Sequence, residues 1–376
     1  MIKDTGEERL KQLTVSGNWV MKFAELEGKP GEPTRSISFV GIEFKPLDYR
    51  TLADAQLHLP VTVPLDWRNA KIIECDIAGM DIDAVVKGNA VLESILSSST
   101  IGLLQGGWLP SGLAVTRPGV TILLDRNVVG QIRARYEDGT VIAESRDFLD
   151  LLAELEIRIN PLLFAIEGNG RGIPAPSTVK AQLEEAVQII EKALPKATIA
   201  IGERSLEGVL GLIEDARAGL ARKQAFLLEI APSLTPPTSH RLLDAKWQEV
   251  LDAADGHGVR RNALVVLAAL SAVAVPNSGS PAKKLLKFRS GYSTGDAYNA
   301  LADLRSLEIL SSLLAMFPEE RPALFTADKA LALFWVGMRA HNFRQEANGT
   351  AFNLAPVENL LPRNAINRWR EAVSRK

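Results

Sequence analysis

The sequence predicts an α/β fold built on a mostly parallel sheet, and three observations support this prediction. Residues 120–124 form a continuous apolar run that ends on Asp125, and the mainly apolar residues 323–327 lead to Asp328 in the same way. An unbroken apolar run of this length is typical of a strand buried on both faces of a parallel sheet. Between the two runs, apolar positions over residues 176–276 recur at helical spacing.

Residues 1–116 are expected to form a β-rich N-terminal accessory region. Polar and apolar side chains alternate over residues 36–39, and short runs such as residues 71–75 stand between turns rich in Pro and Gly. The single cysteine, Cys75, is expected to lie buried in a strand. The character of the sequence changes at Arg-Pro-Gly (117–119), which we take as the boundary of this region.

Residues 117–345 are expected to form the main domain. A helix is predicted through residues 146–152, and long helices are predicted in an insertion at about residues 176–276. Residues 346–376 are expected to form a C-terminal helical tail. The sequence shows no internal repeat and no low-complexity tract.

A helix late in the main domain carries several polar residues on one side. Ser293 and Thr294 predict its N-cap, and Asp296, Asn299 and Asp303 follow at helical spacing. Residues separated by three, four or seven positions share a face of a helix, and the opposite face here is rich in Leu. The polar face is expected to look into a crevice.

Composition limits the classes of function. The chain has 376 residues, of which 46% are hydrophobic, so it can bury a sizeable core. The net charge of -2 means that any nucleic-acid contact must come from a local basic patch. One cysteine excludes an internal disulfide, and no Cys or His cluster has zinc spacing.

No membrane partner is expected. The longest apolar run, residues 263–275, is shorter than the roughly 20 residues that a membrane helix needs. The N-terminal residues lack the apolar core of a signal peptide. Together with the single cysteine, these features predict a cytoplasmic protein.

Asp125 and Asp328 are the first candidates for a functional site. Each follows a predicted buried strand, and open parallel sheets bind ligands at the carboxyl ends of their strands. Carboxylates held close together repel one another unless a cation compensates. Mg²⁺ and Mn²⁺ prefer oxygen ligands and can activate water against a phosphodiester. Taken singly, each Asp is also a common turn former or helix cap.

The order of acidic residues along the chain adds a further clue. The first predicted strand ends in Asp125, with the small polar Asn127 two positions on, and a second acid follows on an early helix. A third acid lies on a later helix. A fourth follows a second predicted strand, in a Thr-x-Asp sequence. These later residues are Glu167, Asp303 and Asp328 with Thr326. Over about residues 120–340, this pattern resembles the PIN-domain (PIN-like) nuclease family.

The resemblance implies a three-layer α/β/α sandwich and a metal-dependent endoribonuclease that hydrolyses RNA with Mg²⁺ or Mn²⁺. It also implies roles for individual residues. Asn127 and Thr326 would position the ligands or the scissile phosphate. The chain departs from compact members of the family through its helical insertion and its N-terminal region, and Asp296 can replace Asp303 as the third acid. The implied metal ligands and catalytic residues are Asp125, Glu167, Asp303 and Asp328.

Several basic residues are candidates for contact with phosphates. Lys287 lies in a segment of cations and aromatic side chains just ahead of the Asp303 helix. Arg126 follows the first acid, and Arg171 lies in the glycine-rich loop at residues 168–172. That loop lacks the Lys-Ser/Thr sequence of a P-loop and is interpreted as a turn.

Two other functions compete with a nuclease. A phosphatase of the haloacid dehalogenase type also begins with an Asp after a buried strand, but that family needs a second Asp where this chain has Asn127. A catalytically silent PIN-like module that binds RNA or a protein partner keeps the same fold. A regulatory protein partner that blocks the site is a further expectation from toxin-type relatives. The residues alone do not select RNA over DNA.

Overall fold

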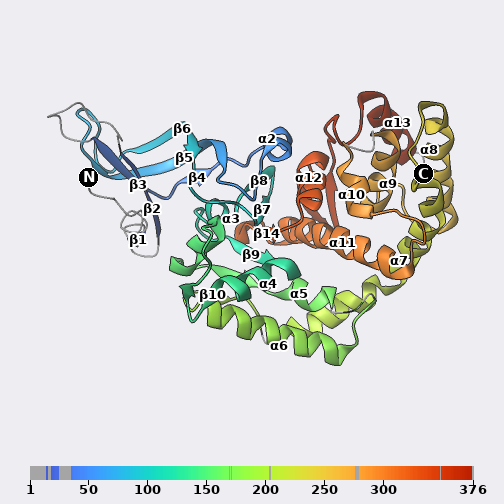
Figure 1. Cartoon of the computed structure of the whole chain (residues 1–376), viewed down its shortest axis with the longest axis horizontal. Coiled ribbons are helices and arrows are strands. Elements are labelled where there is room, and N and C mark those ends of the chain that lie inside the picture. The colour runs from blue at the N-terminus through green and yellow to red at the C-terminus, as the bar shows by residue number, and fades with distance from the viewer. Residues whose placement is uncertain are drawn as a thin grey trace.

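The structure is a computed structural model of the whole chain, and it has mixed α/β architecture. Figure 1 shows a β-rich N-terminal part at one end, a second sheet in the middle, and a group of helices at the other end. The residues that the structure describes are 14–15, 18–24, 35–168, 170, 172–202, 205–275, 279–347 and 349–374.

The N-terminal part is β-rich, as the sequence predicted, and its strands form an antiparallel sheet. Its strand order is β1-β2-β3-β5-β4, and β6 pairs with β5. Cys75 ends the longest strand and is half-buried, not buried, because the chain leaves the sheet at this point. The elements are β1 (Thr14–Val15), β2 (Asn18–Ala24), β3 (Ser36–Val40), β4 (Glu43–Phe44), β5 (Thr62–Cys75), β6 (Val85–Glu93) and the helix α2 (Tyr49–Asp54).

The central sheet has six strands in the order β13-β12-β9-β14-β7-β8. The first four are parallel to one another, and β7 and β8 complete the sheet in antiparallel pairs, so the sheet is mixed. The strands are β7 (Ile101–Leu104), β8 (Gly107–Pro110), β9 (Thr121–Leu124), β12 (Arg158–Asn160), β13 (Thr198–Ile199) and β14 (Ala323–Thr326).

The boundary predicted at residue 116 does not coincide with an edge of this sheet. β7 and β8 lie before that residue, yet β7 pairs with β14 in register from Ile101 to Leu103. The short helix α3 (Ser111–Ala114) follows β8 and packs against β7 and β8. The central sheet therefore begins within the region that the sequence assigned to the N-terminal part.

Both strands that were read from apolar runs lie at the centre of the sheet. Ile122, Leu123 and Leu124 in β9 have no exposed surface, and neither have Leu324 and Phe325 in β14. Strands covered on both faces need apolar side chains at every position, which explains why the runs are continuous and not alternating.

The chain reverses its direction across the sheet at β9. From β9 it proceeds outward to β12 and β13, and it returns to the other side of β9 as β14. Two neighbouring parallel strands whose connections leave in opposite directions form a crevice at their carboxyl ends. This crevice lies where β9 leads to Asp125 and β14 leads to Asp328.

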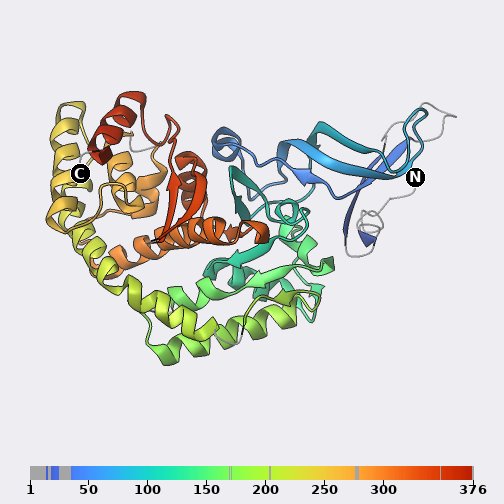
Figure 2. The ribbon, with the colours of Figure 1, turned by 180° about the vertical axis from the view of Figure 1, so that it is seen from behind.

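Helices cover the sheet and extend beyond it. Figures 1 and 2 show α6 along the outer edge of the molecule, outside α4 and α5, and α7 continuing along α11. α5 packs against β9, and α11 and α12 pack against β14. These helices are α4 (Arg126–Arg135), α5 (Leu162–Glu167), α6 (Pro176–Ala193), α7 (Ser205–Leu234), α11 (Thr294–Met316) and α12 (Lys329–Met338).

The predicted insertion is mainly helical, but it contributes strand β13 to the central sheet. The helix predicted through residues 146–152 is present as the 3-10 helix η1 (Phe148–Glu154), which begins at a capping box on Asp147. The remaining helices are η2 (His240–Leu242), α8 (Leu243–Gly256), α9 (Leu264–Ala274), α10 (Pro281–Leu286) and η3 (Pro318–Glu320).

The predicted C-terminal tail is only partly helical. It contains β16 (Gly349–Asn353), which pairs with β15 (His341–Glu346), and the helix α13 (Arg363–Ser374). Another hairpin joins β10 (Tyr136–Glu137) to β11 (Thr140–Val141). Over the described ranges, no helix combines the length and the apolar character needed to cross a membrane.

Substitution of a central strand residue should destabilise the protein strongly. Ile122 has no exposed surface in β9, so Ile122→Ala removes buried methyl groups and leaves a cavity, at a cost of about 2–5 kcal/mol in the free energy of unfolding. Val91→Ala in β6, where the side chain is 63% exposed, should change this free energy by about 0.5 kcal/mol or less. Urea denaturation of both variants measures the difference, and equal losses would contradict the central placement of β9.

Candidate active site

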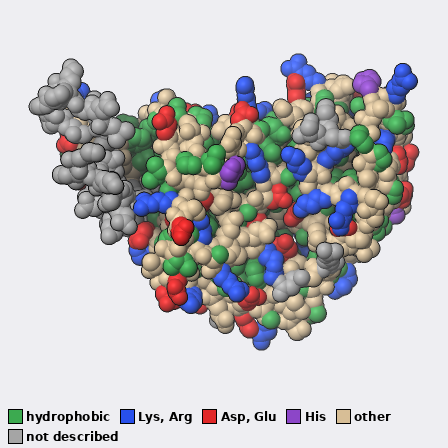
Figure 3. Space-filling model, in the orientation of Figure 1, with side chains coloured by type: hydrophobic (Ala, Val, Ile, Leu, Met, Phe, Trp, Pro, Cys, Tyr) green, Lys and Arg blue, Asp and Glu red, His purple; other side chains and the backbone are tan. Residues whose placement is uncertain are grey.

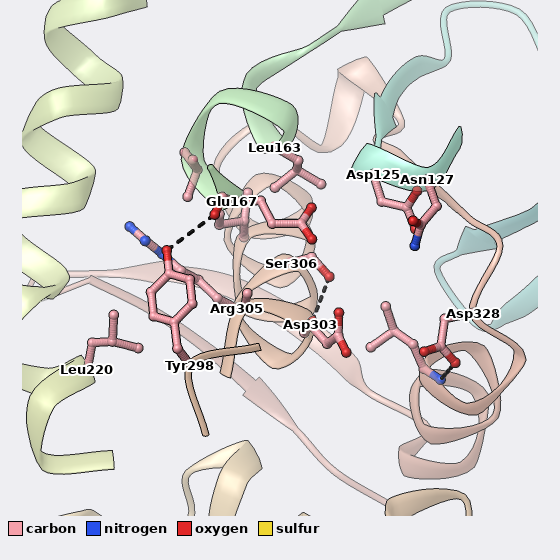
Figure 4. A pocket seen from close by; sticks show the side chains of 14 residues that line it. Asp125, Asn127, Leu163, Glu167, Leu220, Tyr298, Asp303, Arg305, Ser306 and Asp328 are labelled. Carbon is pink, nitrogen blue, oxygen red and sulfur yellow. Dashed lines mark hydrogen bonds between the residues drawn. The ribbon is translucent and has the colours of Figure 1, made fainter. Parts of the chain in front are cut away.

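One pocket collects acidic side chains from separate elements of the fold. Asp125 follows β9, Glu167 ends α5, Asp303 lies in the middle of α11, and Asp328 precedes α12; all four line the pocket. In Figure 4, the carboxylates of Glu167 and Asp303 point toward the space that the other two border. The pocket volume is about 30 Å³, which is enough for water and an ion but not for a nucleotide. A large substrate would have to lie across its mouth.

Asp125 has both a structural role and a place in the pocket. Its Oδ1 accepts a hydrogen bond of 2.8 Å from the backbone N–H of Val128 and so caps α4. The side chain of Thr326 provides another hydrogen bond. Burial nevertheless raises the pKa of Asp125 to about 6, with these hydrogen bonds acting against the shift.

Asp328 is the corresponding residue after β14. Its Oδ1 accepts hydrogen bonds from the backbone N–H groups of Ala330 at 2.7 Å and Leu331 at 3.0 Å, which caps α12. Thr326 Oγ1 accepts a hydrogen bond from the backbone N–H of Asp328 at 3.0 Å. Thr326 therefore ties the two strand-end acids together.

Glu167 is held by the start of α4. Burial raises the pKa of its carboxyl group, and a hydrogen bond from the backbone N–H of Arg126 opposes the shift. The Arg126 guanidinium stacks over the ring of Phe164 at 4.3 Å from the ring centre and donates a 3.1 Å hydrogen bond to the carbonyl of Gly168. Arg126 does not line the pocket; it fixes α5 and with it the position of Glu167.

Of the two acids considered on α11, Asp303 lines the pocket and Asp296 does not. Asp296 forms the capping box of α11 with Ser293 and receives a 2.8 Å hydrogen bond from Arg289. Two hydrogen bonds from Ser293 lower the pKa of Asp296 to about 2, and the one from its backbone N–H has the larger effect. Asp296 is therefore a satisfied helix cap at the edge of the site.

The pKa of Asp303 is strongly raised. Burial is the first cause and the negative charge of Asp328 the second, and together they raise the pKa of Asp303 to about 8. The charges of Glu167 and Asp125 add to the shift, while Lys287 opposes it. The four side chains thus interact electrostatically, and the site favours either a proton on Asp303 or a compensating cation.

The carboxylates are not arranged as a ready metal site. Within the described parts of the chain, no group of three or more Asp, Glu, His or Cys side chains is positioned to hold a metal ion. The four carboxylates of the pocket offer oxygen ligands and repel one another, and this chemistry fits a hard divalent cation. The present spacing of the four carboxylates does not fit such an ion, so their side chains would have to turn toward a common point to bind it.

The residues predicted to contact substrate divide into several groups. Asn127 is exposed and lines the pocket. Thr326 is fully buried, so it can position the acids but cannot touch a substrate. Lys287 lies outside the pocket, exposed at the C-cap of α10. Arg171 lies outside the described residues.

Sequence reasoning missed other residues that line the pocket. Tyr298, Arg305 and Ser306 come from α11, and Leu220 comes from α7, within the helical insertion. Tyr298 donates a 3.3 Å hydrogen bond to the carbonyl of Glu167, and Arg305 donates one of 2.9 Å to the carbonyl of Leu212. Helical spacing from Asp303 could have indicated Ser306, three positions on, but not Tyr298 or Arg305, and no signal in the sequence places Leu220 here.

Comparisons of the chain with protein-family models, with curated proteins and with solved structures gave no match.

The raised pKa of Asp303 predicts how stability depends on pH. The folded-state pKa of about 8 exceeds the ordinary value of 3.8, so between these values the folded protein holds a proton that the unfolded chain has lost. Stability should therefore fall as the pH rises through this window. Asp303→Asn should flatten this dependence and stabilise the protein at about pH 8.

Thermal denaturation from about pH 5 to 8 measures this slope. Asp296→Asn is the matched control on the same helix, because its pKa of about 2 lies below the window. This control should lower the melting temperature without changing the slope. An unchanged slope in Asp303→Asn would refute the assignment of the proton to Asp303.

Proposed function

We propose that this protein is a metal-dependent endoribonuclease whose catalytic centre is the acidic pocket. The observation that carries the proposal is the convergence of Asp125, Glu167, Asp303 and Asp328 in one pocket at the reversal point of the sheet. These acids are far apart in the sequence and come from separate elements. A pocket with four carboxylates in this position is suited to metal-assisted hydrolysis of a phosphodiester.

The order of the acids supports the finer assignment to a PIN-like α/β/α sandwich. The first acid follows the central strand β9, and the last follows its parallel neighbour β14 in the Thr-x-Asp sequence. The other two lie on helices in between. The resemblance rests on the sequence and the shared pocket on the structure, and the four acids named from the resemblance are among the residues that line the pocket.

Mg²⁺ or Mn²⁺ bound by these carboxylates would activate water and stabilise the leaving oxygen of the substrate. The residues of the chain have the supporting roles. Thr326 and the first turns of α4 and α12 orient Asp125 and Asp328. Asn127, exposed at the mouth, is placed to donate its amide N–H to a phosphate oxygen.

RNA as the substrate requires local positive charge, because the net charge of the chain is -2. Lys284 and Lys287 are exposed on α10 and at its C-cap, and in the described part of the chain neither forms an ion pair. Figure 3 shows Lys and Arg side chains gathered over the area where Figure 1 places α10 and α11. This side of the pocket would contact the phosphate backbone, and the proposal includes a cytoplasmic location.

A second candidate is a catalytically silent module that binds RNA or a regulatory protein partner. The observation that favours it is the spacing of the acids, which does not form a ready metal site among the described residues. This alternative predicts RNA binding that needs no divalent cation and leaves the RNA intact.

Cleavage of RNA tests the main proposal. The purified protein should cut RNA in Mn²⁺ or Mg²⁺, and Asp125→Asn or Asp303→Asn should reduce the rate by more than about 100-fold, because ligand losses exceed the 10- to 100-fold effects of outer partners. Gel analysis of labelled RNA, with and without EDTA, measures the rate.

The matched control for this assay is Asp296→Asn, since this acid lies on α11 outside the pocket. It should keep the activity of the unaltered protein once folding is confirmed by circular dichroism. Full activity in Asp125→Asn would exclude the acidic centre, whereas cation-independent binding without cleavage would favour the silent module.

Metal binding can be measured without activity. Mn²⁺ in excess over its Kd should raise the melting temperature of the unaltered protein, since a ligand that binds only the folded state stabilises it. Asp303→Asn should lose most of this shift, and Asp296→Asn should retain it. Equal shifts in both variants would place the ion elsewhere.

A further inference from the structure

A cluster of arginines lies at the opposite end of the central sheet from the acidic pocket. Three guanidinium groups approach the carboxylate of Glu43: Arg68 at 3.1 Å, Arg321 at 3.4 Å and Arg117 at 3.6 Å. They come from β5, from the residue after η3, and from the segment before β9. One nearly buried carboxylate thus stands among three cations.

The cluster adjoins a pocket of about 230 Å³. Arg117 and Arg321 line it together with Gln105, which is exposed. Leu109 and Leu113 contribute an apolar wall. The pocket therefore combines a cationic side with an apolar side, as sites for small organic anions do.

The positive charge of the cluster is not fully compensated. Nε of Arg117 is buried and lies 3.6 Å from Glu43, so among the described residues it has this ion pair but no hydrogen bond. Burial lowers the pKa of Arg117, and repulsion from Arg321 lowers it further. Glu43 does not line the pocket itself, and Glu319, the carboxylate among its described lining residues, is exposed. An additional anion would satisfy Arg117 and relieve this repulsion.

A phosphoryl group suits this arrangement better than a second carboxylate. A phosphate monoester carries close to two negative charges and has three strong acceptor oxygens. Arginine forks bind such oxygens in pairs, and two guanidinium groups can share one phosphoryl group. The single carboxylate of Glu43 neutralises only one of the three arginines, so an incoming group with more than one negative charge is favoured.

We propose that the pocket lined by Arg117 and Arg321 binds the phosphate monoester of a small organic molecule or of a nucleic-acid end. The two sources share the terminal phosphoryl group that the arginines recognise. This site is separate from the acidic centre, because Val120 lines it while Asp125 lies five residues on, roughly 16 Å along β9. It does not depend on the proposed nuclease function.

Isothermal titration calorimetry in EDTA tests the proposal without cleavage. The probes are inorganic phosphate, adenosine monophosphate, and a short oligoribonucleotide with either a 5′-phosphate or a 5′-hydroxyl. We expect binding of phosphate-bearing probes and at least a tenfold loss in Arg117→Gln. Tighter binding of the nucleotide identifies a small-molecule ligand, and tighter binding of the 5′-phosphorylated RNA identifies a nucleic-acid end.

Two further variants separate binding from stability. Glu43→Gln removes the competing carboxylate and should tighten phosphate binding, an effect that a purely structural cluster would not produce. Arg158→Gln is the matched control, because Arg158 pairs with Glu320 at 3.6 Å and does not line the pocket. Absence of phosphate binding by the unaltered protein, or equal affinity in Arg117→Gln and Arg158→Gln, would overturn the proposal.

Discussion

The crowding of carboxylates between the ends of β9 and β14 is the constraint on which much of the structure depends. Charged groups in a poorly solvated pocket are costly unless they receive hydrogen bonds or opposite charge. Helix α4 begins at Asp125 and helix α12 at Asp328, and backbone N–H groups in the first turn of each helix donate hydrogen bonds to these carboxylates. The start of α4 also supports Glu167, and Lys287 lies close enough to reduce the shift on Asp303.

The features that the sequence predicted well depend on residues close together along the chain. β9 and β14 were read from continuous apolar runs because full burial leaves no polar position in a strand. The cap of α11 at Ser293 was predicted because a capping residue bonds within its own first turn. The fold class followed from such elements, since strands that alternate with helices favour a parallel sheet.

The features that the sequence could not predict depend on pairing between distant segments. The attachment of β7 to β14 joins residues more than two hundred positions apart, and periodicity carries no information about it. The same is true of Leu220 in the acidic pocket and of Arg321 beside Glu43. Asp296 and Asp303 share a helical face, so spacing alone could not show which of them lines the pocket. In the structure Asp296 belongs to the capping box of α11, and Asp303 lines the pocket.

The pairing of β7 with β14 also limits how the chain can be divided. Strand β14 carries Thr326, and its outer edge is completed by backbone groups that precede residue 116. The amine of Lys329 and the indole of Trp335 donate to carbonyls of Ala55 and Leu104 in the same early segment. The segment before residue 116 is therefore not a detachable module, because strands from both sides of this boundary assemble the central sheet at which the acidic pocket lies.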